Sequence, residues 1–178
     1  MPLEHVIAQQ FAAPSSSGKK IQVEVDTWEQ CTDKPDLPVM FQDIEVRRIP
    51  ETGDFVFNGV INFTETVHSP WKMTVEMNKC LSNANMNTCT PFFSTEVKDV
   101  CSKLPQENQM WTKFIKDIKM KRNCPVGPEV YHITDMGSEP SDMKYFPLDN
   151  SFYTVTVTGF SKGKEIYCMY VTFQTKMA

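Results

Sequence analysis

The chain leaves a helical pattern at Asn123-Cys124-Pro125-Val126-Gly127-Pro128-Glu129-Val130-Tyr131. The two prolines in this stretch fix φ and forbid a continuing helix, and Gly127 can adopt backbone conformations that other residues avoid. Cys124 can tie the stretch to an element upstream in the chain. The stretch therefore predicts a rigid, cross-linked corner.

The chain carries six cysteines, none of them in a Cys-x-x-Cys pair: Cys31, Cys80, Cys89, Cys101, Cys124 and Cys168. This spacing is poor for a structural zinc site and favours three disulfides, but spacing alone does not select a pairing. The length of 178 residues is typical of a single domain. We expect a flexible N-terminal segment over residues 1–19, which ends in a Ser/Gly-rich lead-in, and one domain over residues 20–178.

Apolar and polar residues alternate along much of the chain, which is the pattern of half-buried β-strands. The clearest strand covers residues 54–64, whose large apolar residues share one face: Phe55, Phe57, Ile61 and Phe63. Further strands are predicted at residues 20–28, 41–49, 71–80, 130–133, 151–160 and 165–175. The last two strands form a hairpin, because Gly163 between them suits a turn position with positive φ.

Residues 94–118 lose the two-residue period, and apolar residues recur there with helical spacing. Pro105 divides this region into two parts. The second part carries an apolar stripe made of Met110, Trp111, Phe114, Ile115 and Ile118. We therefore predict one or two amphipathic helices, preceded by a polar loop over residues 81–88.

Little in the sequence points to catalysis, a cofactor or nucleic acid. The chain has three histidines, His5, His68 and His132, and none of them lies in a recognisable catalytic motif. The net charge is −4, and the chain lacks the clustered Lys and Arg that phosphate binding requires. We expect no enzymatic activity, no cofactor, no metal site and no nucleic-acid partner.

The Cys124-Pro125-x-x-Gly127 corner, followed by Tyr131 late in a small six-cysteine chain, resembles the ganglioside-activator branch of the ML-like lipid-recognition superfamily. Within that branch, the chain is similar to secreted insect chemosensory proteins, over roughly residues 20–176. The resemblance implies a mostly β fold, an antiparallel β-cup or sandwich with a short helical section. It also implies the disulfide pairing Cys31–Cys168, Cys80–Cys89 and Cys101–Cys124.

The large aromatic residues and methionines are expected first of all to form the hydrophobic core. Periodicity cannot tell whether such residues fill a core or line a ligand cavity. The resemblance favours a cavity, since relatives of this branch hold acyl chains between two sheets that stay apart. We expect a pocket of roughly 300–1,000 Å³ with the Trp111 segment near its entrance. Its candidate ligand-binding walls are Trp71, Met73, Val75, Met77, Trp111, Phe114, Val155, Met169 and Phe173.

These features predict a secreted, extracellular monomer that binds a lipid or another long-chain hydrophobic ligand without transforming it. The resemblance implies a chemosensory role, in the perception of contact pheromones or taste compounds, with a membrane surface or a receptor as a further partner. The alternative is a protein-interaction module, either a lipid-presenting activator of an enzyme or an immune co-receptor.

Asn62-Phe63-Thr64 is the only glycosylation sequon in the chain. The parity of the predicted 54–64 strand places Asn62 on the face opposite the aromatic residues. We expect a glycan on Asn62, because a glycan cannot occupy a core.

Overall fold

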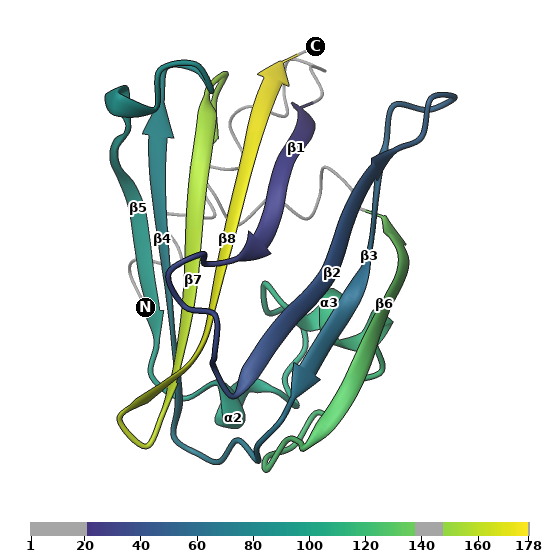
Figure 1. The fold of residues 1–178 in the computed structure, drawn as a ribbon, viewed down its shortest axis with the longest axis vertical. Coiled ribbons are helices and arrows are strands. Elements are labelled where there is room, and N and C mark those ends of the chain that lie inside the picture. The colour runs from purple at the N-terminus through teal and green to yellow at the C-terminus, as the bar shows by residue number, and fades with distance from the viewer. Residues whose placement is uncertain (1–20, 138–147, 178) are drawn as a thin grey trace.

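The computed structural model describes residues 21–137 and 148–177, and most of these residues form antiparallel strands (Figure 1). The N-terminal segment expected at residues 1–19 lies outside the described residues. One sheet has five strands in the order β1 (Ile21–Gln30), β8 (Lys164–Met177), β7 (Phe152–Ser161), β4 (Trp71–Cys80) and β5 (Thr90–Val97). The other sheet has three strands in the order β2 (Val39–Arg48), β3 (Phe55–Phe63) and β6 (Glu129–Gly137).

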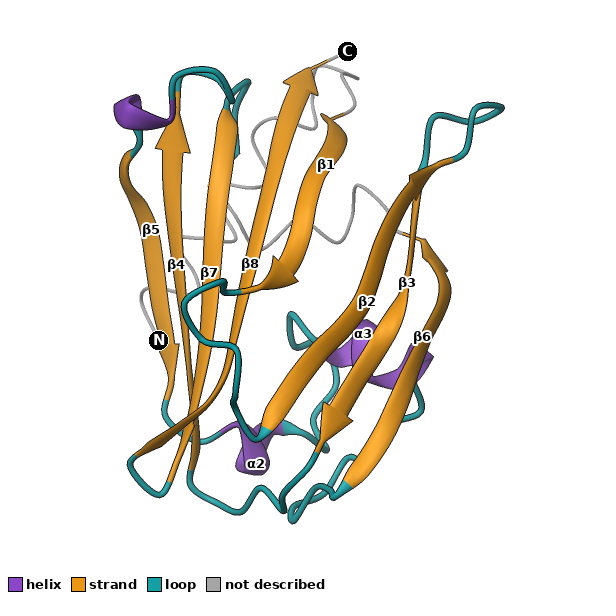
Figure 2. Ribbon diagram, in the orientation of Figure 1, coloured by secondary structure: helices purple, strands orange, loops and turns teal. Residues whose placement is uncertain are grey.

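The two sheets face each other, converge at one end and diverge toward the other (Figure 1). The short helix α2 (Val100–Lys103) lies at the convergent end, and the 3-10 helix η2 (Met86–Thr88) lies at the opposite end of the five-stranded sheet (Figure 2). Helix α3 (Thr112–Asp117) follows α2 in the chain. This arrangement confirms the expected mostly β sandwich with a short helical section.

Strand β4 shows why the alternating pattern produces this core. Its residues Trp71, Met73, Val75 and Met77 are buried, while the residues between them are half-buried or exposed on the outer face. Directly paired residues of antiparallel strands share a face, and β4 pairs with β7 in unbroken register. The predicted β7–β8 hairpin is also confirmed, and both turn residues, Lys162 and Gly163, have positive φ, 53° and 72°.

Strand β5 corrects the sequence-based interpretation, which assigned residues 94–97 to a helical region and predicted no strand at 90–97. The strand lies at the edge of its sheet and pairs only with β4. Pro91 is tolerated there because an edge strand has backbone N–H groups that need no partner strand. Strand β6 is also longer than predicted and extends to Gly137.

All three expected disulfides are present. Cys31–Cys168, Cys80–Cys89 and Cys101–Cys124 have Cα separations of 5.4, 4.0 and 5.5 Å. The first connects the chain just after β1 to β8, the second closes the connection between β4 and β5, and the third attaches α2 to the corner at residues 123–131.

The corner at residues 123–131 packs against the chain between β3 and β4. Val126 is fully buried and exchanges two backbone hydrogen bonds with Val67, of 2.8 and 3.0 Å. Gly127 has φ of +82°, and a Cβ on it would come within 2.8 Å of the Phe63 Cβ. Only glycine therefore fits there without displacing β3.

Candidate functional site: an apolar cavity between the sheets

An apolar cavity of about 280 Å³ lies between the two sheets and is covered in part by the helical section. Its volume is slightly below the range of 300–1,000 Å³ expected from the sequence. The volume is nevertheless far larger than the space that a single water needs. Its lining residues are Trp28, Val39, Phe41, Ile61, Phe63, Trp71, Met73, Val75, Val100, Leu104, Met110, Trp111, Phe114, Ile115, Met120, Val155, Val157, Tyr167 and Met169.

Seven of the nine wall residues predicted from the sequence line this cavity. Met77 and Phe173 do not, although both are buried. Phe173 stacks on Tyr153 with ring centroids 5.3 Å apart, and Tyr153 in turn contacts Phe92 at 5.4 Å. Strand parity identified the correct face for these residues but could not tell how far along the sheet the cavity extends.

The three-stranded sheet contributes lining residues that the sequence-based prediction missed. Val39 and Phe41 come from β2, and Ile61 and Phe63 come from β3. The apolar face of β3 was visible in the sequence as alternation over residues 54–64. What the sequence lacked was a signal that this face opposes the face of β4, because the pairing of faces depends on the arrangement of the sheets.

Trp71 and Tyr167 form a buried aromatic pair in the wall of the cavity. The indole Nε1 of Trp71 donates a 3.1 Å hydrogen bond to the Tyr167 hydroxyl oxygen, and their rings meet edge to face at 6.1 Å. Burial raises the pKa of Tyr167 well above its ordinary value, so the hydroxyl remains neutral. A Cβ at Gly159 would lie 2.2 Å from the Tyr167 ring, which explains why the facing position on β7 is glycine.

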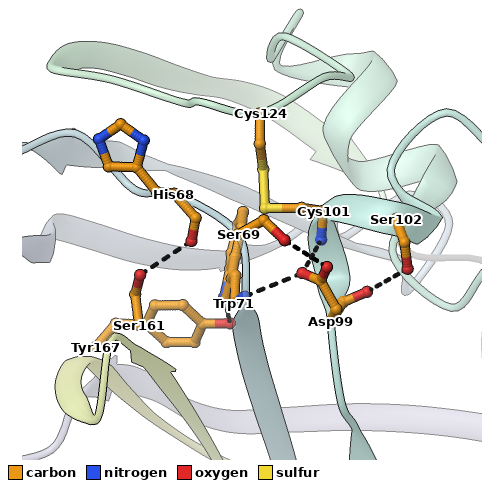
Figure 3. The surroundings of a disulfide bond; sticks show 9 residues. All are labelled: His68, Ser69, Trp71, Asp99, Cys101, Ser102, Cys124, Ser161 and Tyr167. Carbon is orange, nitrogen blue, oxygen red and sulfur yellow. Dashed lines mark hydrogen bonds between the residues drawn. A yellow bond between two sulfur atoms is a disulfide. The ribbon is translucent and has the colours of Figure 1, made fainter.

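The Asp99 carboxylate fixes the start of β4 relative to α2 (Figure 3). It accepts hydrogen bonds from the Ser69 hydroxyl at 2.6 Å and from the backbone N–H groups of Trp71 and Cys101 at 3.0 and 3.1 Å. Partial burial alone would raise the pKa of Asp99, but these hydrogen bonds outweigh it and hold the pKa below its ordinary value. Asp99 thereby positions Trp71, which lines the cavity.

Replacing Asp99 with asparagine will destabilise the protein by about 1–3 kcal/mol at neutral pH, because an amide cannot accept all three hydrogen bonds. The folded-state pKa lies below the unfolded value. The carboxylate's contribution is therefore present above about pH 4 and is lost as the pH falls through the folded-state pKa. Chemical unfolding at pH 7 and below pH 3 measures both effects.

Ser102→Ala is the matched control for this substitution, because the exposed Ser102 hydroxyl donates only to the Asp99 backbone carbonyl. We expect that variant to lose less than about 0.5 kcal/mol and to keep the wild-type pH dependence. An Asp99→Asn variant whose deficit persists unchanged at low pH would show that the carboxylate charge has no part in this network.

Three aromatic residues that line the cavity are half-buried. Trp28 of β1 contacts Phe57 and Phe114 with ring centroids 5.0 and 6.1 Å apart. Trp111, at the start of α3, is half-buried like Trp28 and Phe114. The prediction that the Trp111 segment lies near the entrance stays a prediction.

The described residues around the cavity offer few groups for metal binding. Among residues 21–137 and 148–177, no three His, Cys, Asp or Glu side chains are grouped as a metal ion would require. No charged side chain lines the cavity in the described part of the chain. Within those same residues, no helix has the length and apolar character needed to span a membrane.

No protein-family model matches the chain. No curated protein matches it either. The main indication of function is therefore the cavity itself, with its size and its apolar walls.

Proposed function

We propose that this protein is a secreted binding protein that holds a lipid or another long-chain hydrophobic ligand without transforming it. The observation that supports this most directly is the apolar cavity of about 280 Å³, whose walls carry no charged side chain in the described residues. Each ligand methylene buried in such a cavity contributes about 0.8 kcal/mol before the cost of association. An acyl or hydrocarbon chain fits this chemistry, whereas a polar metabolite would lose its hydration without compensation.

The geometry suggests how such a ligand lies. Trp28 pairs in register with Val171 of β8, and Tyr167 lies four residues before Val171 on the same strand. At about 3.3 Å per residue, the positions of Trp28 and Tyr167 are roughly 13 Å apart along β8. A ligand chain would enter beside Trp28 and Trp111 and end against Trp71 and Tyr167.

Flexible side chains in the walls suit ligands of variable shape. Met73, Met110, Met120 and Met169 all line the cavity, and methionine adapts to irregular apolar surfaces more readily than branched residues do. The resemblance to insect chemosensory proteins extends the proposal to a role in the perception of contact pheromones or taste compounds. On this proposal the ligand is a natural apolar cue. Extraction of the bound ligand followed by mass spectrometry would identify it.

Three disulfides are compatible with an extracellular protein, since such bonds persist in oxidising compartments. Asn62 is half-buried, between the inward-facing Ile61 and Phe63, which agrees with a side chain on the outer face of β3. A glycan there would project away from the cavity. We propose that the protein passes through the secretory pathway and is glycosylated at Asn62.

Native mass spectrometry of the protein secreted from eukaryotic cells tests this proposal. We expect an added mass from a retained lipid, and a glycan mass that peptide-N-glycosidase removes and that Asn62→Gln abolishes. Thr64→Ser is the control, because it preserves the sequon. Protein that carries no lipid and binds none on addition would refute the carrier function, whereas an unchanged mass after glycosidase treatment would refute only the glycan.

A protein-interaction module remains the second candidate, and one surface favours it. Leu81 and Met86, in the connection between β4 and β5, are 79% and 43% exposed at the divergent end of the sheets. Exposed apolar side chains of this size are available for contact with a protein or a membrane. A pure interaction module would retain no ligand, so the lipid measurement above separates the two candidates.

A further inference from the structure

Three aromatic side chains in the wall of the cavity are in contact with one another across the two sheets. The Tyr167 ring of β8 meets the Trp71 ring of β4 edge to face, with ring centroids 6.1 Å apart. It also meets the Phe41 ring of β2, on the opposite sheet, edge to face at 6.0 Å. Aromatic rings at these distances are in direct contact. Tyr167 therefore connects the two sheets, and an alkyl chain cannot pass between these rings without moving them.

Several contacts hold the Tyr167 ring in this position. Its hydroxyl oxygen accepts a hydrogen bond of 3.1 Å from the indole N–H of Trp71. Its ring lies over the facing residue of β7, Gly159, where a Cβ would come within 2.2 Å of it. Tyr167 is also buried. A buried ring with neighbours on these sides has little freedom to turn aside for a ligand.

The strands end shortly beyond this contact. Trp71 is the first residue of β4, and a tight turn joins β7 to β8 close to the Gly159–Tyr167 pair. The other cavity-lining residues of β7 and β8 lie farther from that turn, and they are Val155, Val157 and Met169. On these two strands the cavity therefore extends from Tyr167 in one direction only.

The volume of the cavity limits how much ligand it can bury. A cavity of about 150 Å³ in another protein holds benzene, which has six carbons. By the same ratio, a cavity of about 280 Å³ holds roughly eleven carbons. This is enough for one chain of medium length, and too little for both chains of a diacyl lipid.

We propose that Tyr167 stops the far end of the ligand, so that the cavity buries one unbranched chain of about eleven carbons. This inference rests on the proposed lipid-binding function and specifies its ligand class. Chains up to this length gain affinity with each added methylene, because each one leaves water for an apolar site. In longer chains the additional methylenes stay in water and contribute little.

The test measures the binding of straight-chain fatty acids of 6 to 18 carbons by competition against a fluorescent lipid at pH 8. Their carboxylates stay in water, because no cationic side chain lines the cavity among the described residues. We expect the affinity to rise about fourfold for each methylene up to about twelve carbons, the carboxyl carbon included. Beyond this break each methylene should add less than about 1.5-fold.

Tyr167→Leu removes the ring that stops the chain. The break should move about three to four carbons longer, because the leucine side chain is smaller by about four heavy atoms. Tyr167→Phe is the matched control. It keeps the ring but, like Tyr167→Leu, leaves the Trp71 N–H without its acceptor, so the break should stay at about twelve carbons.

A photoaffinity measurement on the wild-type protein does not depend on whether the variants fold. The probe is dodecanoic acid with a diazirine next to its terminal carbon, and peptide mapping identifies the residues that it labels. We expect the label on Tyr167, Trp71 or Phe41, because the end of the chain should lie against these rings.

A fourfold gain that continues unchanged to 18 carbons, or that ends before about 8, would overturn the length limit and leave the carrier function standing. A break that stays at twelve carbons in folded Tyr167→Leu, or a label confined to residues away from the three rings, would overturn the role of Tyr167. Failure of every fatty acid to bind would refute the proposed function itself.

Discussion

Replacing Met169 with glutamate will lower the affinity for an apolar ligand by at least about a hundredfold while the protein remains folded. Met169 lines the cavity from β8 and is half-buried, so a carboxylate can reach water when no ligand is bound. A bound chain would bury that charge without a partner, at an effective cost of several kcal/mol. About 2.8 kcal/mol corresponds to the hundredfold loss, which competition against a fluorescent lipid measures.

Two controls separate the charge from other effects. Met169→Gln has a similar shape without the charge and should lose far less affinity than Met169→Glu. Val25→Glu places the same charge at another half-buried residue that packs against the core but does not line the cavity, and it should bind ligand nearly as the wild type does. If Val25→Glu and Met169→Glu lose affinity equally, ligand does not occupy this cavity.

Removal of the Cys31–Cys168 disulfide will destabilise the protein more than removal of Cys80–Cys89. The two bonds join residues separated by 137 and 9 positions. On the chain-entropy estimate, replacing both cysteines by serine costs about 5 kcal/mol for the long loop and about 2.6 kcal/mol for the short one. Chemical unfolding of the two double variants measures the difference.

The Cys80/Cys89 variant serves as the control for the general cost of replacing cysteine pairs. Peptide mapping under non-reducing conditions should confirm that the two remaining disulfides are unchanged in each variant. An equal loss of unfolding free energy in the two variants would mean that native-state contacts, rather than loop closure, determine what these bonds contribute.

The strands predicted most clearly from the sequence are those with one face toward solvent and one face toward the core. β4 alternates most cleanly, because it lies inside a sheet and turns one face to the core. β5 escaped prediction because Phe92 and Phe93, adjacent in the chain, are both half-buried, which gives no two-residue period. An edge position alone does not explain this, since β1, β2 and β6 also lie at edges and were predicted.

The candidate site was predictable in part for the same reason. The odd-numbered residues of β4 had to face the core, and Trp71, Met73 and Val75 do line the cavity. Their neighbour Met77 follows the same parity, yet packs in the core outside it. The contact of Tyr167 with a ring of the opposite sheet could not be predicted at all, since such a contact is a property of the assembled surroundings and not of the residue.

The pairing of β1 with β8 has a consequence for how the protein is made. Val25 lies opposite Phe173 in the register, and the two residues are separated by most of the described chain. At a synthesis rate of about 5–20 residues per second, β1 is synthesised roughly 7–30 s before its partner strand β8. During that time its apolar residues Val23, Val25 and Trp28 have no sheet to cover them. We expect the nascent chain to depend on chaperones of its compartment for that interval, because an unpaired strand with an apolar face readily associates with other chains.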